Sequence, residues 1–374
     1  MTVRIVHGGN LHEAAQRYGI PYGQWLDLST GINPHAYPVP PVPADAWRRL
    51  PDEDDDFAAC AARYYGAPDA LHVLPVAGSQ TAIRALPALL PRASVAVAAL
   101  TYSEYAPAFE RAGHRIVPLD LAWDVLPEDV THIVVANPNN PTADRLSAAK
   151  LLQWHAQLVE RGGTLVVDEA FVDAYDDELA NGFGEGFVSS VATSLVNARA
   201  QPGPTSSLAA FTSRAGLVVL RSPGKFFGLA GARAGFVLAA TPLLDALHDV
   251  LGAWTVSGPA RHAVSAAFDD LAWQRDMRTQ LAKDSARLTA LLQAQRFASR
   301  GTPLFAWTAD ARAAALHHQL ALRGIWTRLF SADGSVRFGL PGTEAQWQRL
   351  EAALVESVQA LDRTTEQTTR DPRT

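Results

Sequence analysis

The feature that most constrains the fold is the alternation of apolar strands and helices over residues 56–240. Short apolar runs such as "SVAVAAL", "THIVVANP", "TLVVDEA" and "AGLVVLRS" alternate with helical patterns such as "APAFERAGH" and "SAAKLLQWHAQLVERGG". Apolar strands that are joined through helices form mainly parallel sheets with helices on both faces. We therefore predict an α/β domain with a mainly parallel sheet between helices.

The remaining segments depart from this alternation and divide the chain into regions. Residues 1–50 are rich in glycine and proline and predict an ordered arm. Residues 51–245 form the predicted large domain, and the long helical patterns after it predict a smaller α+β domain over 246–362. Residues 363–374 are polar and predict a disordered tail. Within the large domain, residues 176–212 have no firm period, which indicates an insertion.

The composition argues against several classes of protein. A net charge of −6 argues against a broad nucleic-acid-binding surface. The chain lacks 18 consecutive apolar residues, and its first residues lack the apolar run of a signal peptide, so we expect no membrane span. The single cysteine, Cys60, allows neither an intrachain disulfide nor a Cys-rich metal site and suits the cytoplasm. We expect no metal.

One of only three lysines, Lys225, lies in the apolar, glycine-rich stretch "LRSPGKFFGLAGARAGF". Apolar surroundings disfavour a charged ammonium, so a lysine there can act as a nucleophilic amine and form an imine with an aldehyde. Arginine cannot do this because its guanidinium stays protonated. Ser222 and Arg233 flank the lysine, and a hydroxyl with a guanidinium suits a phosphate group. Taken alone, Lys225 is equally consistent with a surface lysine on a glycine loop.

Three further segments place polar residues at strand ends or helix starts. "TLVVDEAF" ends a predicted strand at Asp168, where ligands bind in open α/β sheets. "VAGSQTAIRAL" begins a helix at Gly78, Ser79 and Gln80, whose backbone N–H groups attract phosphate. "THIVVANPNNPT" places Asn137 in a turn. Each segment also has a purely structural explanation, as a cap or a plain turn.

In this order the segments resemble the fold-type I pyridoxal-phosphate enzymes, the aspartate aminotransferase superfamily. The resemblance implies a large domain with a mainly parallel sheet, a smaller α+β domain, and pyridoxal 5′-phosphate as the cofactor. It implies that Lys225 binds the cofactor covalently and that Asp168 keeps the pyridine nitrogen protonated. The other implied cofactor contacts are Gly78, Ser79, Gln80, Ser222 and Arg233 at the phosphate, Tyr102 of "LTYSEY" on the ring, and Asn137 at the ring oxygen.

Two segments of the N-terminal arm indicate which reaction of this superfamily the chain catalyses. "HGGNLHEAAQRYG" and "WLDLSTGINPHAYP" look like the threonine-phosphate decarboxylases of cobalamin biosynthesis. This resemblance implies decarboxylation of L-threonine O-3-phosphate to (R)-1-amino-2-propanol O-2-phosphate, with the arm contributing to the active site. The implied substrate-binding groups are His7, the backbone N–H of Gly8, Asn33, Arg328 of "GIWTRLF" and Arg337 of "SVRFGLPG".

The resemblance leaves alternatives and departures. An aminotransferase of the histidinol-phosphate type and an inactive binding protein on the same fold remain open, because this fold hosts many functions. The superfamily builds its active sites at a two-fold interface, so we expect a homodimer that acts on a small phosphorylated amino acid. Leu50 stands where many relatives carry a tyrosine that reaches the partner subunit's cofactor phosphate, and Phe171 stands where aminotransferases often have a tyrosine. The sequence does not decide whether serine phosphate is accepted.

Overall fold

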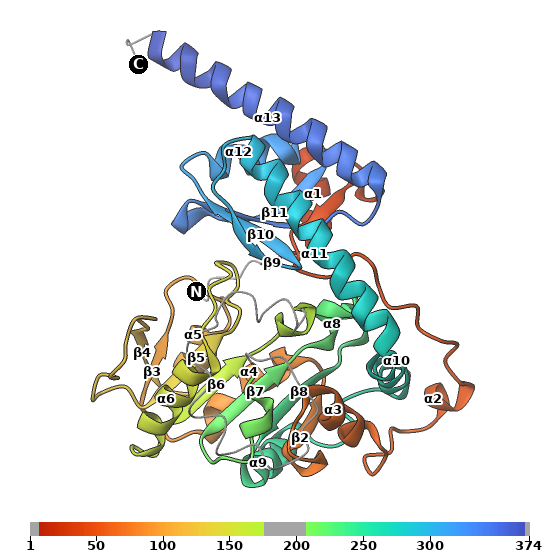
Figure 1. Cartoon of the computed structure of the whole chain (residues 1–374), viewed down its shortest axis with the longest axis vertical. Helices are drawn as coiled ribbons and strands as arrows, with labels where there is room; N and C mark the ends of the chain where they lie inside the picture. The colour runs from red at the N-terminus through yellow and green to blue at the C-terminus, as the bar shows by residue number, and fades with distance from the viewer. Residues whose placement is uncertain (1–6, 176–206, 371–374) are drawn as a thin grey trace. The chain divides into compact units, whose positions relative to one another are not determined.

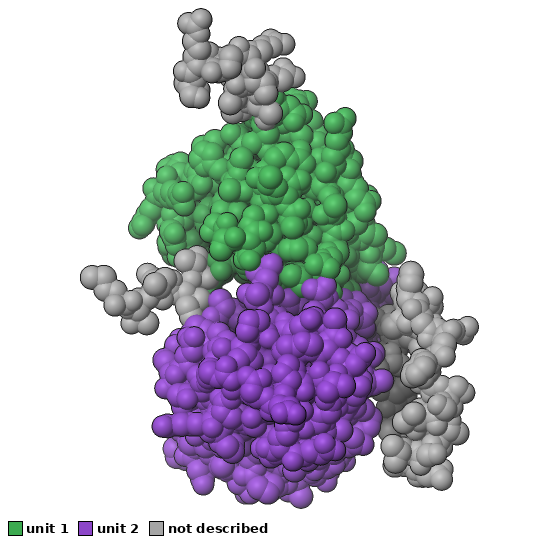
Figure 2. Space-filling model, turned by 90° about the vertical axis from the view of Figure 1, so that its left-hand side faces the viewer, with its two compact units in different colours: residues 1–35, 141–143, 280–374 green, residues 36–140, 144–279 purple. Residues whose placement is uncertain are grey.

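The computed structural model describes residues 7–175 and 207–370, with side chains described as far as residue 363. The chain divides into two compact units, which Figure 2 colours separately. The large unit consists of Ala36–Asn140 and Asp144–Thr279. The small unit consists of Met1–His35, Pro141–Ala143 and Gln280–Thr374.

The large unit is built on a seven-stranded sheet (Figure 1). In spatial order its strands are β2 (Val73–Val76), β8 (Gly235–Ala239), β7 (Leu217–Arg221), β6 (Thr164–Asp168), β5 (His132–Ala136), β3 (Ser94–Val97) and β4 (Arg115–Pro118). All neighbours from β7 to β4 run parallel, and β8 is antiparallel to both of its neighbours. The predicted mainly parallel sheet is therefore confirmed.

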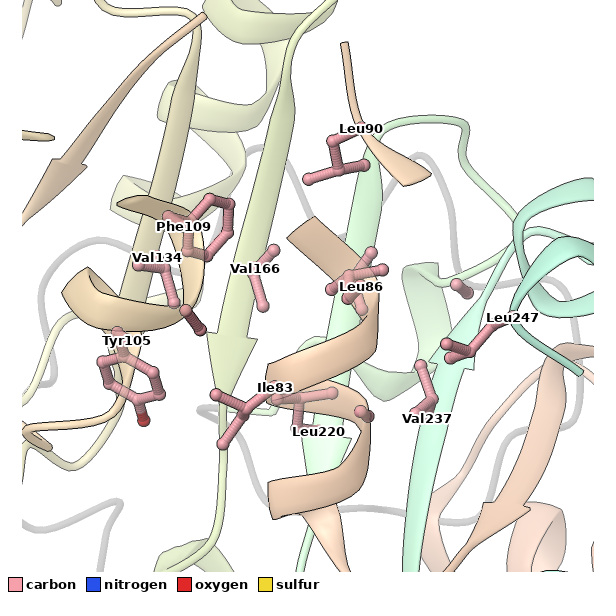
Figure 3. Close-up of a cluster of buried hydrophobic side chains, with 14 of the residues drawn as sticks. Ile83, Leu86, Leu90, Tyr105, Phe109, Val134, Val166, Leu220, Val237 and Leu247 are labelled. Carbon is pink, nitrogen blue, oxygen red and sulfur yellow. The ribbon is translucent and has the colours of Figure 1, made fainter. Parts of the chain in front are cut away.

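Helices cover both faces of this sheet, as its apolar strands require. On one face, α4 (Ser79–Ala85), α5 (Tyr105–Arg111) and α9 (Thr241–Leu251) pack on alternate strand residues (Figure 3). On the other face, the ring of Phe236 lies between 5.1 and 5.7 Å from three rings of α3 (Phe57–Tyr65) and α10 (Gly258–Asp269). Helices α2 (Ala44–Arg48), α6 (Ala148–Val159) and α8 (Pro223–Phe226) also belong to the unit.

The small unit contains a five-stranded sheet and the first part of the N-terminal arm. The strand order is β1 (Leu26–Leu28), β11 (Ile325–Phe330), β12 (Ser335–Gly339), β10 (Phe305–Ala309) and β9 (Arg300–Thr302). Strand β1 runs parallel to β11, while the other neighbours are antiparallel. The helices are α1 (Leu11–Tyr18), α12 (Ala313–Ala321) and α13 (Glu344–Arg370). The arm thus supplies a helix and an edge strand to this unit.

The unit boundaries differ from those predicted from the sequence. Helix α11 (Leu271–Ala294) runs through the boundary at residues 279–280, and α10 packs on α3 inside the large unit. The change to long helices near residue 245 therefore marks a change of pattern and not the end of the unit. The arm likewise divides after His35.

Two other predicted segments lie partly beyond the described residues. Most of the predicted insertion at 176–212 falls outside them, since the structure resumes at 207. The tail predicted to be disordered from 363 begins as helix, because α13 continues to Arg370. No glycine or proline interrupts that helix before Pro372. Of the helices in these described ranges, none combines the length and apolar composition that a bilayer span needs.

Candidate active site

Lys225 lies on the short helix α8, directly after strand β7. Its Nζ is 6.0 Å from the centroid of the Phe171 ring, and Phe171 is buried. A Cβ added at Gly224 would lie 2.9 Å from the Cα of Ala230, so the chain needs a glycine there to pass. Lys225 therefore has an aromatic wall beside its amine and a tightly packed backbone beneath it.

The predicted phosphate-binding groups lie together at the start of α4. The Ser79 and Ser222 hydroxyl oxygens are 2.9 Å apart, although 143 residues separate them in the chain. A Cβ at Gly78, whose φ is +79°, would lie 2.6 Å from the Arg233 guanidinium, and one at Gly235 would lie 2.5 Å from the Ser79 nitrogen. Arg233 itself has a φ of 51°, which costs a non-glycine residue about 1–2 kcal/mol. The site thus combines the hydroxyls of Ser79 and Ser222, the backbone at Gly78 and Ser79, and the exposed guanidinium of Arg233. We call this group the cradle, and its donors suit a phosphate.

Asp168 ends strand β6 with a side chain that is 6% exposed. Its Oδ2 accepts a hydrogen bond of 2.7 Å from the Tyr105 hydroxyl, and its Oδ1 accepts one of 3.0 Å from the Ala170 N–H. Burial raises the pKa of the Asp168 carboxyl, whereas these two donors and the Lys225 charge each lower it. The carboxylate is therefore oriented by two donors in a dry position where it can hold a proton on a ligand.

Tyr105 is a residue that sequence reasoning missed. It lies three positions after Tyr102 on the first turn of α5, and its ring packs edge-on against Tyr102 at 5.4 Å. The Tyr102 hydroxyl donates to Gln80 Oε1 at 2.8 Å, and burial raises the pKa of Tyr102 to about 12. Both phenols are therefore neutral near pH 7. The second tyrosine of "LTYSEY", three positions after the first, was the available signal.

The asparagines of the motif "NPNNPT" differ in their contacts, which the sequence did not predict. Asn137 is buried, and its amide exchanges two hydrogen bonds with the Leu146 backbone, at 2.9 and 3.0 Å. Asn139 is also buried, and its Oδ1 accepts from the Thr101 hydroxyl at 2.7 Å. Asn140 is the half-buried asparagine of the three. Asn137 thus holds the turn with both ends of its side chain.

The small unit brings the two predicted substrate arginines side by side. Arg328 on β11 and Arg337 on β12 are directly opposite each other in the antiparallel pair. Burial, and next the Arg328 charge, lower the pKa of Arg337 to about 10, while Asp27 partly opposes them. Burial also lowers the pKa of Arg328. Like charges opposed in a buried sheet destabilise each other, and an anionic ligand relieves that repulsion.

The arm contacts Arg337 of this pair. Arg337 donates to the Ser29 carbonyl at 2.7 Å, and a Cβ at Gly8 would lie 2.4 Å from that same oxygen. The Gly9 N–H donates to the Ser29 hydroxyl at 2.7 Å. His7, which is exposed, precedes this contact directly. The predicted His7–Gly8 segment therefore lies against Ser29, whose carbonyl accepts the hydrogen bond from Arg337.

Asn33 completes the predicted substrate residues of the small unit. It is 2% exposed, and its Oδ1 accepts the His35 N–H at 2.9 Å. The His35 ring in turn lies 2.9 Å from Asp284 Oδ2 on α11. The side chain of Asn33 is thus fixed by the turn that follows it. Every predicted cofactor residue belongs to the large unit and every predicted substrate residue to the small unit.

The chain is similar to known proteins over most of its length. Residues 45–354 match the family model for aminotransferase class I and II. Threonine-phosphate decarboxylase from Pseudomonas aeruginosa is 47% identical over 94% of this chain and 97% of its own length. The enzyme of that name from a Sinorhizobium species is 40% identical over 95% of this chain and 98% of its own. The chain therefore belongs to the aminotransferase class I and II family.

Solved structures show the same fold. Histidinol-phosphate aminotransferase from Sinorhizobium meliloti, in complex with pyridoxal-5′-phosphate, aligns with a TM-score of 0.74 at 19% identity over 96% of both chains. L-threonine-O-3-phosphate decarboxylase from Porphyromonas gingivalis aligns with a TM-score of 0.67 at 18% identity, over 89% of this chain and 99% of that one. The chain therefore has the fold-type I architecture that the sequence predicted.

Proposed function

We propose that this protein decarboxylates L-threonine O-3-phosphate to (R)-1-amino-2-propanol O-2-phosphate. The observation that carries the proposal is the pair formed by half-buried Arg328 and buried Arg337, which suits a substrate with two anionic groups. The Pseudomonas aeruginosa threonine-phosphate decarboxylase, at 47% identity over nearly the whole chain, supports it. The enzyme is thus a carboxy-lyase.

The cofactor is pyridoxal 5′-phosphate, and the large unit has the groups that it needs. When bound, the cofactor supplies an electron-accepting ring for the bond that breaks at the substrate α-carbon. Ser79, Ser222 and Arg233 bind its phosphate in the cradle that Gly78 keeps open. Asp168 holds a proton on the pyridine nitrogen. These roles are proposals that rest on the clustering of the residues.

Two further contacts complete the assignment. Tyr102 lies beside the cradle through its bond to Gln80 and supplies the aromatic face for the ring. We assign the ring-oxygen contact to Asn140 in place of Asn137, because Asn137 spends both ends of its amide on Leu146. Substituting alanine for Asn140 is then expected to weaken cofactor binding.

The lysine carries the covalent and proton-transfer roles. Lys225 Nζ would bind the cofactor covalently. After carbon dioxide has left, Lys225 Nζ would donate a proton to the substrate α-carbon, which takes back the electron pair of the broken bond. The Phe171 ring beside Nζ excludes water from that proton transfer.

The small unit selects the substrate. Arg328 and Arg337 receive its anionic groups, and the His7 ring, the Gly8 N–H and Asn33 add donors from the arm. Binding an anion between the two guanidiniums offsets both the burial of Arg337 and the repulsion between the pair. A zwitterionic amino acid without a phosphate gives less of this compensation, so phosphorylated substrates are favoured.

Decarboxylation and transamination are separated by a product assay. Incubation with threonine phosphate is expected to release one carbon dioxide for each aminopropanol phosphate formed. Amine transfer to 2-oxoglutarate without carbon dioxide would instead favour an aminotransferase of the histidinol-phosphate type. A protein whose absorbance stays unchanged on adding pyridoxal phosphate would support an inactive binding protein.

We also propose that the enzyme works as a homodimer in the cytoplasm, to which its single cysteine is suited. Trp47 on α2 and Leu50 just after it are 70% and 67% exposed. Leu50 lines a hollow of about 470 Å³ together with Arg49 and His262. Exposed large apolar groups of this kind are typical of subunit contacts. Sedimentation is expected to give twice the chain mass of 40.1 kDa.

A further inference from the structure

A buried charge cluster lies at the ends of strands β6 and β7, and the proposed function does not use it. Arg221, the last residue of β7, is 1% exposed. Its Nη1 donates to Glu169 Oε2 at 2.5 Å, and its Nη2 donates to Asp173 Oδ1. Glu169 is 0% exposed and Asp173 is 4% exposed. We call these three residues the arginine clamp.

Other segments of the large unit form hydrogen bonds and a cation–π contact with the arginine clamp. The Ser207 hydroxyl and the Leu208 N–H donate to the Glu169 carboxylate at 2.6 and 2.8 Å. Arg278 on α11 donates through Nε to the Asp173 carbonyl at 2.9 Å. The Arg221 guanidinium also lies 4.3 Å from the Tyr65 ring centroid on α3. The clamp therefore joins two strand ends to two helices.

The clamp is a poor device for stability. It buries two carboxylates with one guanidinium, and buried ion pairs contribute little net stability because desolvation offsets their attraction. Two of its atoms, Arg221 Nε and Asp173 Oδ2, have no hydrogen-bond partner among residues 7–175 and 207–363. Buried polar groups without partners are costly and uncommon. Folding alone gives no physical reason for this arrangement.

Its position relative to Asp168 gives the reason. Successive residues of a strand point to opposite faces of the sheet, so Asp168 and Glu169 face opposite ways, as do Leu220 and Arg221. Asp168 pairs with Leu220 in the ladder, and the Glu169 N–H donates to the Leu220 carbonyl at 2.9 Å. The arginine clamp therefore connects the ends of β6 and β7 on the face of the sheet opposite to the Asp168 side chain.

The same strand ends lead directly to the reactive groups. Arg221 precedes Ser222, whose hydroxyl contacts Ser79, and α8 then places Lys225. The Arg221 charge also lowers the pKa of the Asp168 carboxyl, after larger effects from burial, Tyr105, Ala170 and Lys225. A shift of the clamp therefore moves Asp168 and the cradle relative to each other.

We propose that Arg221, held by Glu169 and Asp173, is a positioning residue that fixes the separation of Asp168 from Ser222 and Lys225. The role rests on the proposed functions of those three residues toward the cofactor. Arg221 acts through its strand and touches neither the cofactor nor the substrate.

The first test compares two matched substitutions in the large unit. Arg221→Lys keeps the charge, but one ammonium cannot replace the fork that spans two carboxylates. Arg261→Lys is the control, because Arg261 is also buried and pairs with a carboxylate, Asp55, at 2.7 Å. Apoprotein melting temperature, cofactor dissociation constant and the pH midpoint of the bound-cofactor absorbance are measured for both. Both variants are expected to lose thermal stability, but only Arg221→Lys weakens cofactor binding, on the order of 10-fold to 100-fold, and moves the absorbance midpoint.

A second variant removes the charges without leaving any unpaired. Glu169→Gln, Asp173→Asn and Arg221→Met together are expected to leave the apoprotein at least as heat-stable as the wild type. Cofactor binding, measured well below the melting temperature, is still expected to weaken about tenfold or more. The proposal is overturned if the folded variants bind the cofactor within twofold of wild type with an unchanged absorbance midpoint. A wild type that binds the cofactor but releases no carbon dioxide would refute the proposed reaction alone.

Discussion

Replacing Arg328 with methionine is expected to stabilise the protein while weakening its hold on the substrate. Methionine keeps much of the apolar stem and removes a charge directly opposite Arg337. The two arginines belong to one antiparallel pair, and the pKa of Arg337 is lowered by burial first and by Arg328 second. Removing one charge therefore relieves a repulsion that the folded apoprotein carries permanently.

The magnitude follows from the lowered pKa of Arg337. The lowering of the Arg337 pKa to about 10 corresponds to a free energy of about 3 kcal/mol. Burial is the larger cause of the lowered pKa, so the repulsion from Arg328 accounts for about 1 kcal/mol of this free energy. For a unit of this size, that stabilisation raises the melting temperature by about 2–4 °C. Loss of one charged contact to the substrate costs about 1.5–3 kcal/mol, or about 10-fold to 100-fold in affinity.

The assay is a thermal melt of the apoprotein beside calorimetric titration of the holoenzyme with aminopropanol phosphate, the proposed product, which retains the phosphate and does not react further. Arg300→Met is the matched control, since Arg300 lies on the same sheet with its guanidinium 4.8 Å from an aromatic ring, but is exposed. The control is expected to change stability by less than about 0.5 kcal/mol and to leave the affinity for aminopropanol phosphate unchanged. A lower melting temperature for Arg328→Met, together with unchanged affinity, would refute the reasoning.

Three other substitutions test the large unit. Lys225→Ala is expected to abolish the absorbance of covalently bound cofactor and all turnover, whereas Lys283→Ala keeps both in the same spectrophotometric assay. Gly78→Ala puts a Cβ 2.6 Å from the Arg233 guanidinium at a φ of +79°. Equilibrium dialysis is therefore expected to show a cofactor affinity at least about tenfold lower. An unchanged affinity would contradict the proposal that this segment binds the cofactor phosphate. Tyr105→Phe removes a donor to Asp168 and is expected to lower the unfolding free energy by about 2 kcal/mol in urea, and an unchanged midpoint would argue against that bond.

The sequence predicted what local pattern determines. Apolar runs separated by helical periods specify parallel strands, and the strand-end position of Asp168 follows from the same pattern. These inferences need no knowledge of distant contacts.

The sequence could not predict how side chains divide their hydrogen bonds. Asn137 stands first in its motif, but only the folded turn shows that Leu146 takes both ends of its amide. Tyr105 and Arg221 act through residues 63 and 52 positions away, on neighbouring elements of the large unit. The boundary between the two units lies inside the continuous helix α11, so no break in the helical periodicity of the sequence marks it. Such features arise from packing, which overrides local propensity.

The opposite orientations of Asp168 and Glu169 limit how this enzyme can change in evolution. Because side chains alternate with a period of two, inserting one residue into β6 would exchange the two carboxyls between the faces. The acid of the site would then face the clamp, and the clamp would lose one of its anchors. Substitutions can accumulate along this strand, but changes of its length cannot, so new length is expected in the connections between strands.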